Sequence, residues 1–212
     1  MKIIGRGAEA NLYMDGGKLI KERIRKDYRI GEIDKTLRKT RTKREFSLMQ
    51  RAGRSNIPTP RAYDADLENY KITMELIDGV IMREFFESLP ENRLGLVGEL
   101  SENLGEIVGD MHRADIVHND LTTSNVMLKR MDEENKGEIY KIFIIDFGLG
   151  VFSKRIEDKS IDLLVFKKAL RAAHPEIFEN IYENFIRGYK KYEMADAVLK
   201  NLKAAEKRGR YL

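Results

Sequence analysis

The chain has 212 residues, which is enough for one domain with an ample core or for two small lobes. It contains no cysteine, so disulfide bonds, cysteine-ligated zinc and thiol catalysis are excluded. No apolar run is long enough to span a bilayer, and glycine and charge interrupt the first residues too early for a signal peptide. We therefore expect a cytoplasmic protein that does not enter a membrane.

The formal net charge of +4 conceals two basic clusters. Residues 18–44 hold twelve Lys and Arg against four Asp and Glu, and residues 200–210 hold five against one. Such clusters occur on nucleic-acid-binding surfaces and also on ordinary solvated helix faces. Composition alone leaves both interpretations open.

The first part of the chain alternates short apolar runs with turn residues, a pattern typical of strands. We predict strands at residues 1–4, 11–14, 18–21, 61–64 and 70–76. The turn at residues 15–17 is rich in glycine and predicts a hairpin. A 3.6-residue period predicts a helix over residues 34–52, which Gly53 is expected to end. A loop with two prolines follows at residues 56–60.

The second part of the chain is mostly helical. We predict helices at residues 82–88, 92–113, 158–172, 175–191 and 193–207. Pro175 suits a first helical turn. Residues 126–129 and 139–145 are predicted to form a strand pair, joined by an exposed polar run at residues 131–138.

These elements predict an α+β fold of two lobes. Asp78 and Gly79 form the expected boundary between them. Residues 1–78 would make a β-rich N-lobe with one main helix, and residues 79–212 a helical C-lobe with a basic tail.

Two short motifs carry the chemistry. Asp120 and Asn125 lie five residues apart after the long helix, and Asp146-Phe147-Gly148 follows two apolar runs. Together they resemble the catalytic loop and the metal-binding triplet of protein kinases. The resemblance implies that the two lobes form a minimal protein-kinase-like fold. Asp120 can accept a hydroxyl proton, so it is the candidate catalytic residue. Asn125 and Asp146 supply the oxygen ligands that Mg²⁺ prefers, so they are the candidate metal ligands for Mg²⁺ and ATP.

A lysine and a glutamate are expected to hold the phosphates of ATP. Lys21 is the candidate lysine, because Leu19 and Ile20 precede it on a predicted strand. Lys18 on the same strand is the competing choice. Glu45, on the helix that follows, is its candidate partner, since the kinase template pairs a strand lysine with a helix glutamate. An ordinary surface lysine and a solvated helix carboxylate would fit the same pattern.

Gly5, Gly7, Ala8 and Glu9 belong to the segment expected to cover the phosphates. Glycine lets backbone N–H groups approach phosphate oxygens. Ala10 stands where the template has a third glycine. Glu9 would place a negative charge near the phosphates, which weakens binding unless the side chain is turned away or paired. Glu9 is therefore a candidate control element.

The remaining predictions rest on analogy with kinases. A hinge between the lobes would bind adenine through backbone groups, and its residues are Met74, Glu75, Leu76 and Ile77. His118 is predicted to be structural and not to transfer a proton. Asp162 either ties its helix to the catalytic loop or is a helix N-terminal acid favoured by the dipole.

With these motifs in place, the chain closely resembles the PRPK family, the small atypical kinases of the KEOPS tRNA-modification complex. The resemblance covers nearly the whole chain. Its segments are residues 7–10, Lys21 with 26–29, residues 37–38 with 41–42, and residues 72–75, 117–125, 146–150 and 157–159.

The resemblance implies a kinase that binds ATP and Mg²⁺, autophosphorylates on Ser or Thr, and hydrolyses ATP within its complex. It implies direct contact with the KEOPS catalytic subunit, a metal-binding threonylcarbamoyltransferase of the sugar-kinase/actin fold, and association with other KEOPS subunits. That complex makes N6-threonylcarbamoyladenosine (t6A) beside the anticodon of ANN-decoding tRNAs. ATP hydrolysis would support this modification, and the basic surface and tail would contact tRNA.

The chain also departs from ordinary protein kinases. Asn119 replaces the arginine that reads a phosphorylated activation loop, and Thr122 replaces a lysine near the transferred phosphate. Residues 148–158 leave little room for an activation segment, and no Ala-Pro-Glu motif follows. These departures favour water or one of the chain's own serines as acceptor, with activity controlled by a bound partner.

Two other functions fit parts of the pattern. A small-molecule kinase of the aminoglycoside or choline type shares the His-x-Asp and Asn loop, although such enzymes carry larger C-terminal helical regions. A non-catalytic adaptor that bridges a partner protein to tRNA would explain the basic clusters. The presence of Lys21, Asp120, Asn125 and Asp146 together favours an enzyme over an adaptor.

Overall fold

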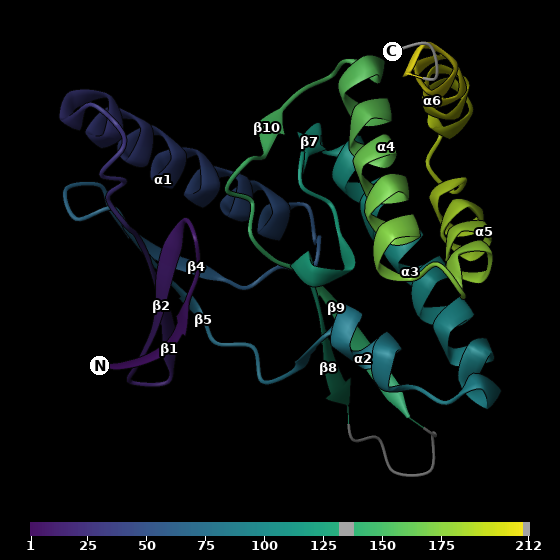
Figure 1. The fold of residues 1–212 in the computed structure, drawn as a ribbon, viewed down its shortest axis with the longest axis horizontal. Helices are drawn as coiled ribbons and strands as arrows, with labels where there is room; N and C mark the ends of the chain where they lie inside the picture. The colour runs from purple at the N-terminus through teal and green to yellow at the C-terminus, as the bar shows by residue number, and fades with distance from the viewer. Residues whose placement is uncertain (132–137, 210–212) are drawn as a thin grey trace.

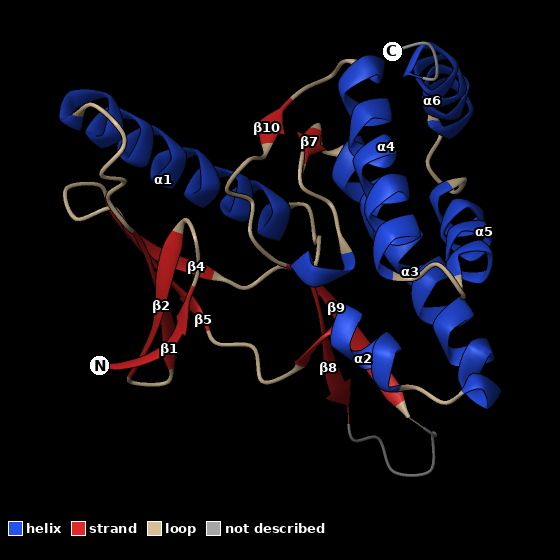
Figure 2. Ribbon diagram, viewed as in Figure 1, coloured by secondary structure: helices blue, strands red, loops and turns tan. Residues whose placement is uncertain are grey.

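The computed structural model describes residues 1–131 and 138–209. An N-terminal region of sheet and one long helix lies beside a mainly helical C-terminal region (Figure 1). Figure 2 shows the same division, with the largest group of strands on one side and most helices on the other. The predicted boundary at residues 78–79 falls between the strands β5 and β6, and its exact role stays a prediction.

The N-terminal sheet is antiparallel, with the strand order β1-β2-β3-β5-β4. Its strands are β1 (Lys2–Arg6), β2 (Ala10–Asp15), β3 (Lys18–Arg23), β4 (Ala62–Asp66) and β5 (Lys71–Glu75). Gly16 and Gly17 adopt φ of 53° and 74° in the β2–β3 turn, which forms the predicted hairpin. Because side chains alternate along a strand, Lys21 and Arg23 point to the same side of β3, and both are buried.

Helix α1 (Gly31–Arg54) packs against β4 and β5. The prediction that Gly53 ends this helix is wrong, because Gly53 lies within the last turn. The chain instead leaves the helix at Asn56, which adopts a left-handed φ of 57° that asparagine tolerates better than most residues. The N–H of Ile57 then donates to the carbonyl of Ala52 at 3.0 Å and closes the helix end.

The C-terminal region is built on helices with short strands between them. The helices are α2 (Met82–Ser88), α3 (Leu94–Arg113), α4 (Ile156–Ala173), α5 (Phe178–Tyr189) and α6 (Ala195–Gly209), with 3-10 turns η1 (Glu91–Arg93) and η2 (Thr123–Asn125). The strands are β6 (Val80–Ile81), β7 (Ile116–Val117), β8 (Val126–Met131), β9 (Ile139–Ile144) and β10 (Val151–Phe152). They form the sheets β6-β8-β9 and β10-β7. The sequence does not predict β6, β7 and β10, because a two-residue strand has no periodicity.

Helices α3 and α5 approach each other through glycine. A β-carbon added at Gly105 would collide with the carbonyl oxygen of Phe185, and one added at Gly188 would collide with that of Glu102. Leu104 beside this contact is fully buried in the core. The two helices therefore pack backbone against backbone and give the C-terminal region a rigid base.

The prediction that Pro175 occupies a first helical turn is wrong, because α5 begins at Phe178 and Pro175 lies in the turn before it. His174 is held on two sides. Its N–H donates to the carbonyl of Leu170 at 2.8 Å, and its ring Nε2 lies 2.9 Å from the hydroxyl of Thr123. These contacts fix the end of α4 immediately before the turn at residues 175–177.

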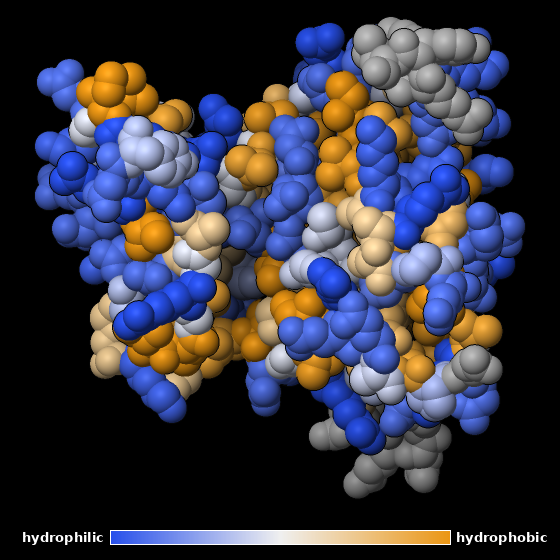
Figure 3. Space-filling model, in the orientation of Figure 1, coloured by the Kyte–Doolittle hydropathy of each residue, from blue (hydrophilic) through white to orange (hydrophobic). Residues whose placement is uncertain are grey.

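Two predicted features fall partly outside the described residues. These are the polar run at residues 131–138, of which 132–137 are not described, and the end of the basic tail at residues 210–212. Among the helices of the described part, none is both long and apolar enough to cross a membrane. On the face shown in Figure 3, hydrophilic residues cover much of α1, and apolar residues gather over the β1–β2 hairpin.

Candidate active site

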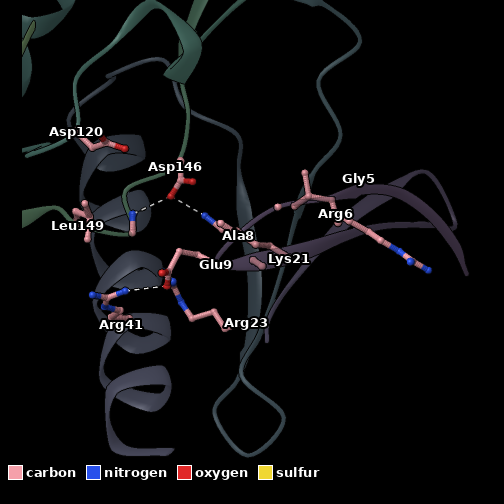
Figure 4. Close-up of a pocket in the computed structure, with 14 residues that line it drawn as sticks. Gly5, Arg6, Ala8, Glu9, Lys21, Arg23, Arg41, Asp120, Asp146 and Leu149 are labelled. Carbon is pink, nitrogen blue, oxygen red and sulfur yellow. Dashed lines mark hydrogen bonds and ion pairs between the residues drawn. The ribbon is translucent and has the colours of Figure 1, made fainter. Parts of the chain in front are cut away.

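Two adjoining cavities open between the N-terminal sheet and the C-terminal region. They share Leu12, Lys21 and Asp146. The apolar cavity is also lined by Leu19, Glu45, Met49, Met74, Glu75, Leu76, Ile77, Met127 and Ile145. The polar cavity is also lined by Gly5, Arg6, Gly7, Ala8, Glu9, Ala10, Arg23, Arg41, Asp120, Gly148 and Leu149 (Figure 4). The structure thus brings the predicted site residues to one place, except that Asn125 lies behind Asp120.

Lys21 lies at the centre of the charged groups. Its Nζ is 2.7 Å from Oε1 of Glu45 and 2.6 Å from Oδ1 of Asp146. Burial alone would lower the pKa of Lys21, but these two carboxylates raise it above its ordinary value. The competing Lys18 lies at the exposed start of β3, with Nζ 5.1 Å from the ring centre of Tyr63. The structure therefore places Lys21, and not Lys18, against the predicted acidic partners.

Glu45 serves two cations at once. It is 1% exposed on α1, and its second oxygen, Oε2, accepts from Nη2 of Arg23. Arg23 is 5% exposed, and its Nη2 lies 3.0 Å from the position that a β-carbon on Gly148 would occupy. The sequence interpretation missed Arg23. The signal was present, because Arg23 is two residues from Lys21 on one strand and so shares its face.

Asp120 and Asn125 form the two ends of a compact loop. The Asn125 side-chain amide donates to the backbone carbonyl of Asp120 at 2.8 Å and to its carboxylate Oδ2 at 3.0 Å. The N–H of Asn125 also donates to the carbonyl of Thr122 at 3.0 Å, which closes the last turn of this loop. Asn125 therefore fixes the orientation of the Asp120 carboxylate at the edge of the polar cavity.

Asp146 is held in a conformation that few residues adopt. Its φ is 61°, and its carboxylate Oδ1 also accepts from the N–H of Gly148 at 3.1 Å. Partial removal from water by the cavity walls would raise the pKa of the half-exposed Asp146 carboxyl, but Lys21 and this N–H outweigh that effect and hold the pKa below its ordinary value. Phe147 is fully buried against the ring of His118, with centroids 5.1 Å apart. The buried phenyl ring anchors the segment, so the neighbouring carboxylate is directed into the cavity.

Asp162 ties helix α4 to the catalytic loop, as one of the two sequence interpretations proposed. Its carboxylate is fully buried and accepts from the backbone N–H groups of His118 and Asn119, both at 2.8 Å. It also accepts from Nε2 of His112 at 3.2 Å. The His118 ring donates from Nε2 to the carbonyl of Ile145 at 3.0 Å, which fits a structural role.

The segment predicted to cover the phosphates is split between a strand and a turn. Gly5 belongs to β1, and the turn beyond it is closed by the Gly7 N–H, which donates to the Ala10 carbonyl at 2.9 Å. Glu9 is paired, which is one of the two arrangements that the sequence analysis named as compatible with phosphate binding. Its Oε2 lies 3.0 Å from Nη1 of Arg41.

Residues 74–77, the predicted adenine-binding hinge, line the apolar cavity. Met74 and Ile77 are buried. The N–H of Glu75 donates to the carbonyl of Arg61 at 2.9 Å, which fixes the strand end.

Comparison with known proteins first defines the class. Residues 9–189 match the model of the Lipopolysaccharide kinase (Kdo/WaaP) family. Among solved structures, the chain is similar to a Rio2 kinase from Chaetomium thermophilum in a complex with ADP, Mg²⁺ and phosphoaspartate. The TM-score is 0.65 at 15% sequence identity, and the match covers 100% of this chain and 72% of that one. WaaP in complex with acyl carrier protein gives a TM-score of 0.63 at 18% identity, covering 97% and 88%. The predicted kinase-like α+β fold is thereby confirmed.

Sequence relatives then identify the family. The protein named KEOPS complex subunit Bud32 from Pyrococcus abyssi is 37% identical over 225 residues, covering 100% of this chain and 96% of its own length. A "Probable bifunctional tRNA threonylcarbamoyladenosine biosynthesis protein" from Methanococcus maripaludis strain C5 is 42% identical over 214 residues. That match covers 99% of this chain, but the chain spans only 36% of the length of that relative. The chain belongs to the Bud32 family, which confirms the resemblance to the KEOPS kinases.

Proposed function

We propose that this chain is an atypical Ser/Thr protein kinase and ATPase of the KEOPS complex, which uses Mg²⁺-ATP to support t6A modification of tRNA. One observation carries the proposal. Lys21 contacts both Glu45 and Asp146 at the junction of an apolar and a polar cavity, with Asp120 on the wall of the latter. Protein kinases hold and transfer the terminal phosphate of ATP with these residue types.

The two cavities suit the two ends of ATP. The apolar cavity along residues 74–77 fits an adenine ring, and the polar cavity with Lys21 and Arg23 fits the phosphates. The carboxylate of Asp146 lines both cavities and, with the side-chain oxygen of Asn125, is the donor set that would hold Mg²⁺. When bound, Mg²⁺ neutralises charge on the phosphates.

Asp120 is the proposed base. It accepts the proton of the attacking hydroxyl or water while a new oxygen–phosphorus bond forms and the bond to the leaving ADP oxygen breaks. Lys21 stabilises the negative charge on the phosphates. Asn125 keeps the Asp120 carboxylate in place through the contacts at 2.8 and 3.0 Å.

The acceptor is proposed to be water or a serine of the chain itself. Only a short stretch with β10 lies between Gly148 and α4, which supports the absence of a platform for a peptide substrate. Of the serines near the motifs, Ser160 is fully buried and its hydroxyl lies 2.7 Å from Oδ1 of Asn201. Ser124 in η2 is exposed and is the better acceptor.

The KEOPS catalytic subunit and tRNA are the proposed partners. The basic cluster at residues 18–44 supports this, because several of its cations are exposed on one helix. They are Lys35, Lys39, Lys43 and Arg44. Lys203 and Lys207 on α6 are exposed as well. Cationic surfaces of this kind bind phosphate backbones in a salt-dependent manner.

The test is Mg²⁺-dependent ATP hydrolysis by the purified chain, alone and with the KEOPS catalytic subunit and tRNA. We expect turnover to rise with the partners and to vanish in Asp146→Ala, while the exposed Asp64→Ala control keeps it. Full turnover in Asp146→Ala would overturn the site assignment. tRNA binding without turnover in any mixture would favour the adaptor function, which the basic surfaces also support. ADP release with small alcohols or amines alone would favour a small-molecule kinase.

A further inference from the structure

Arg41 is a cation of the polar cavity that the kinase template does not require. Arg41 reaches the cavity from α1. Lys21, Arg23 and Asp120 line the same cavity from other elements. Figure 4 shows Arg41 and Glu9 pointing toward each other across the space beside Arg23. The Arg41 side chain is 27% exposed, so solutes can reach its guanidinium group.

Glu9 lies between two arginines. Its Oε2 is 3.0 Å from Nη1 of Arg41, and its Oε1 is 3.9 Å from Nη2 of Arg29. Arg41 lines the polar cavity, whereas Arg29 does not. Arg29 also lies 3.8 Å from Oδ1 of Asp34, which holds it outside the cavity. Glu9 therefore has one cationic partner inside the cavity and a second one outside it.

The backbone around Glu9 is fixed. The Glu9 carbonyl accepts from the N–H of Ile24 at 3.3 Å, and the Gly7 N–H donates to the Ala10 carbonyl at 2.9 Å. The Lys26 ammonium group donates to the carbonyl of Ala8. A rotation of the Glu9 side chain alone can therefore release Arg41, and no movement of the turn is required.

Three other cations line the polar cavity. Arg6 is exposed at the end of β1, and Figure 4 shows its side chain pointing away from Glu9 and Arg41. The other two are engaged by the catalytic groups. Lys21 contacts Glu45 and Asp146, and Arg23 contacts Glu45. Arg41 is instead held by a half-exposed carboxylate outside this cluster. A guanidinium group matches carboxylate and phosphate oxygens with the same planar fork, so one anion can replace the other.

We infer that Arg41 is a phosphate-binding residue, and that Glu9 occupies its anion-binding position until a nucleotide phosphate displaces it. The displaced Glu9 keeps Arg29 as its partner. This inference rests on the proposed function, because it requires a nucleoside triphosphate in the cavity. It assigns to Glu9 the control that the sequence alone suggested, and it names the group that Glu9 controls.

Calorimetric titration with Mg²⁺-ATP, Mg²⁺-ADP and adenosine tests the phosphate role of Arg41. We expect Arg41→Gln to weaken ATP binding about tenfold or more and to leave adenosine binding unchanged. Arg41→Lys should fall between wild type and Arg41→Gln, because it keeps the charge but loses the fork. The control is Arg51→Gln, the same substitution at an exposed position of α1 that does not line the cavity. Thermal unfolding without nucleotide checks that each variant is folded.

A double-mutant cycle tests the exchange with Glu9. Glu9→Gln should strengthen ATP binding several-fold, since it frees Arg41. In the Arg41→Gln background most of this gain should disappear. A gain that persists there would reveal general repulsion between Glu9 and phosphate, and the exchange would be wrong.

The other outcomes separate the two proposals. ATP binding by Arg41→Gln and Arg41→Lys equal to wild type would overturn the phosphate role and leave the proposed function intact. Equal losses of ATP and adenosine binding would assign Arg41 a structural role. Wild-type protein that binds neither ATP nor adenosine would overturn both proposals.

Discussion

The interior of the C-terminal region and its edge at the cavity hold their carboxylates in different ways. Asp162 in the C-terminal region is fully buried and accepts from two backbone N–H groups. Asp146, the carboxylate at the cavity, has a side chain that is 46% exposed and contacts a lysine from the sheet. The buried carboxylate fixes a loop, whereas the exposed one can exchange its lysine for another cation. The same residue type is thus structural or exchangeable according to burial and to the donors around it.

Breaking the buried anchor should have the largest effect. Asp162→Ala leaves the N–H groups of His118 and Asn119 and the ring of His112 without their acceptor. We expect a loss of about 3 to 5 kcal/mol in the free energy of unfolding, measured by urea denaturation. Asp162→Asn retains one acceptor and should lose less. A loss below about 1 kcal/mol in Asp162→Ala would show that Asp162 does not hold the loop.

Glu45 combines features of Asp162 and Asp146, because its side chain is buried and yet lines the apolar cavity. In Glu45→Gln the neutral amide no longer balances Lys21 and Arg23, so we expect a loss of about 2 kcal/mol in stability together with weaker ATP binding. Urea denaturation and nucleotide titration measure the two effects. Glu32→Gln, at an exposed position in the first turn of α1, is the matched control and should change neither. Unchanged ATP binding in Glu45→Gln would separate Glu45 from the nucleotide site.

Acid should weaken the contacts of both Asp146 and Asp162. The pKa values of Asp146 and Asp162 are held below the ordinary value of 3.8, although desolvation opposes this, by Lys21 and by His112 respectively. Well above pH 3.8 both groups are ionised in the folded and unfolded chains, so their stabilising effect is fully present. As the pH falls below 3.8, the unfolded chain takes up protons first and the free energy of unfolding decreases. Urea midpoints across this range should fall less steeply in Asp162→Asn, and an identical slope would contradict the assignment.

The smallest expected effect distinguishes the two lysines of β3. Lys18→Met should change stability by less than about 0.5 kcal/mol and leave ATP turnover intact, because Lys18 lies at the exposed strand start. Lys21→Met should abolish turnover, since it removes the contact to both Glu45 and Asp146. An ATP turnover assay on these two variants checks the assignment of Lys21, and not Lys18, as the phosphate-binding lysine. Loss of turnover in Lys18→Met alone would reverse it.

Periodicity and turn chemistry predict most of the fold. The helix over residues 82–88 has its predicted bounds, and the strands β2 and β3 lie within two residues of the prediction. These elements follow from local patterns that the tertiary structure does not override. The end of α1 depends instead on Asn56, whose left-handed conformation is one of several that its sequence allows.

The site was predictable where a motif fixed both the residue type and its spacing. Asp120, Asn125 and Asp146 are of this kind. Arg23 and Arg41 are not, because their positions depend on how β3 and α1 meet in space. A basic cluster in sequence contains cavity, buried and surface cations alike, and only the packing of the sheet on its helix separates them.

The glycine contact between α3 and α5 has a consequence for how this chain can evolve. At Gly105 and Gly188 not even a methyl group fits between the two backbones. A library of variants selected only for folding should therefore keep glycine at both positions, although neither lies near the cavity. Invariance there would reflect architecture, whereas Arg41 and Glu9 should become free to vary once selection for nucleotide use is lifted.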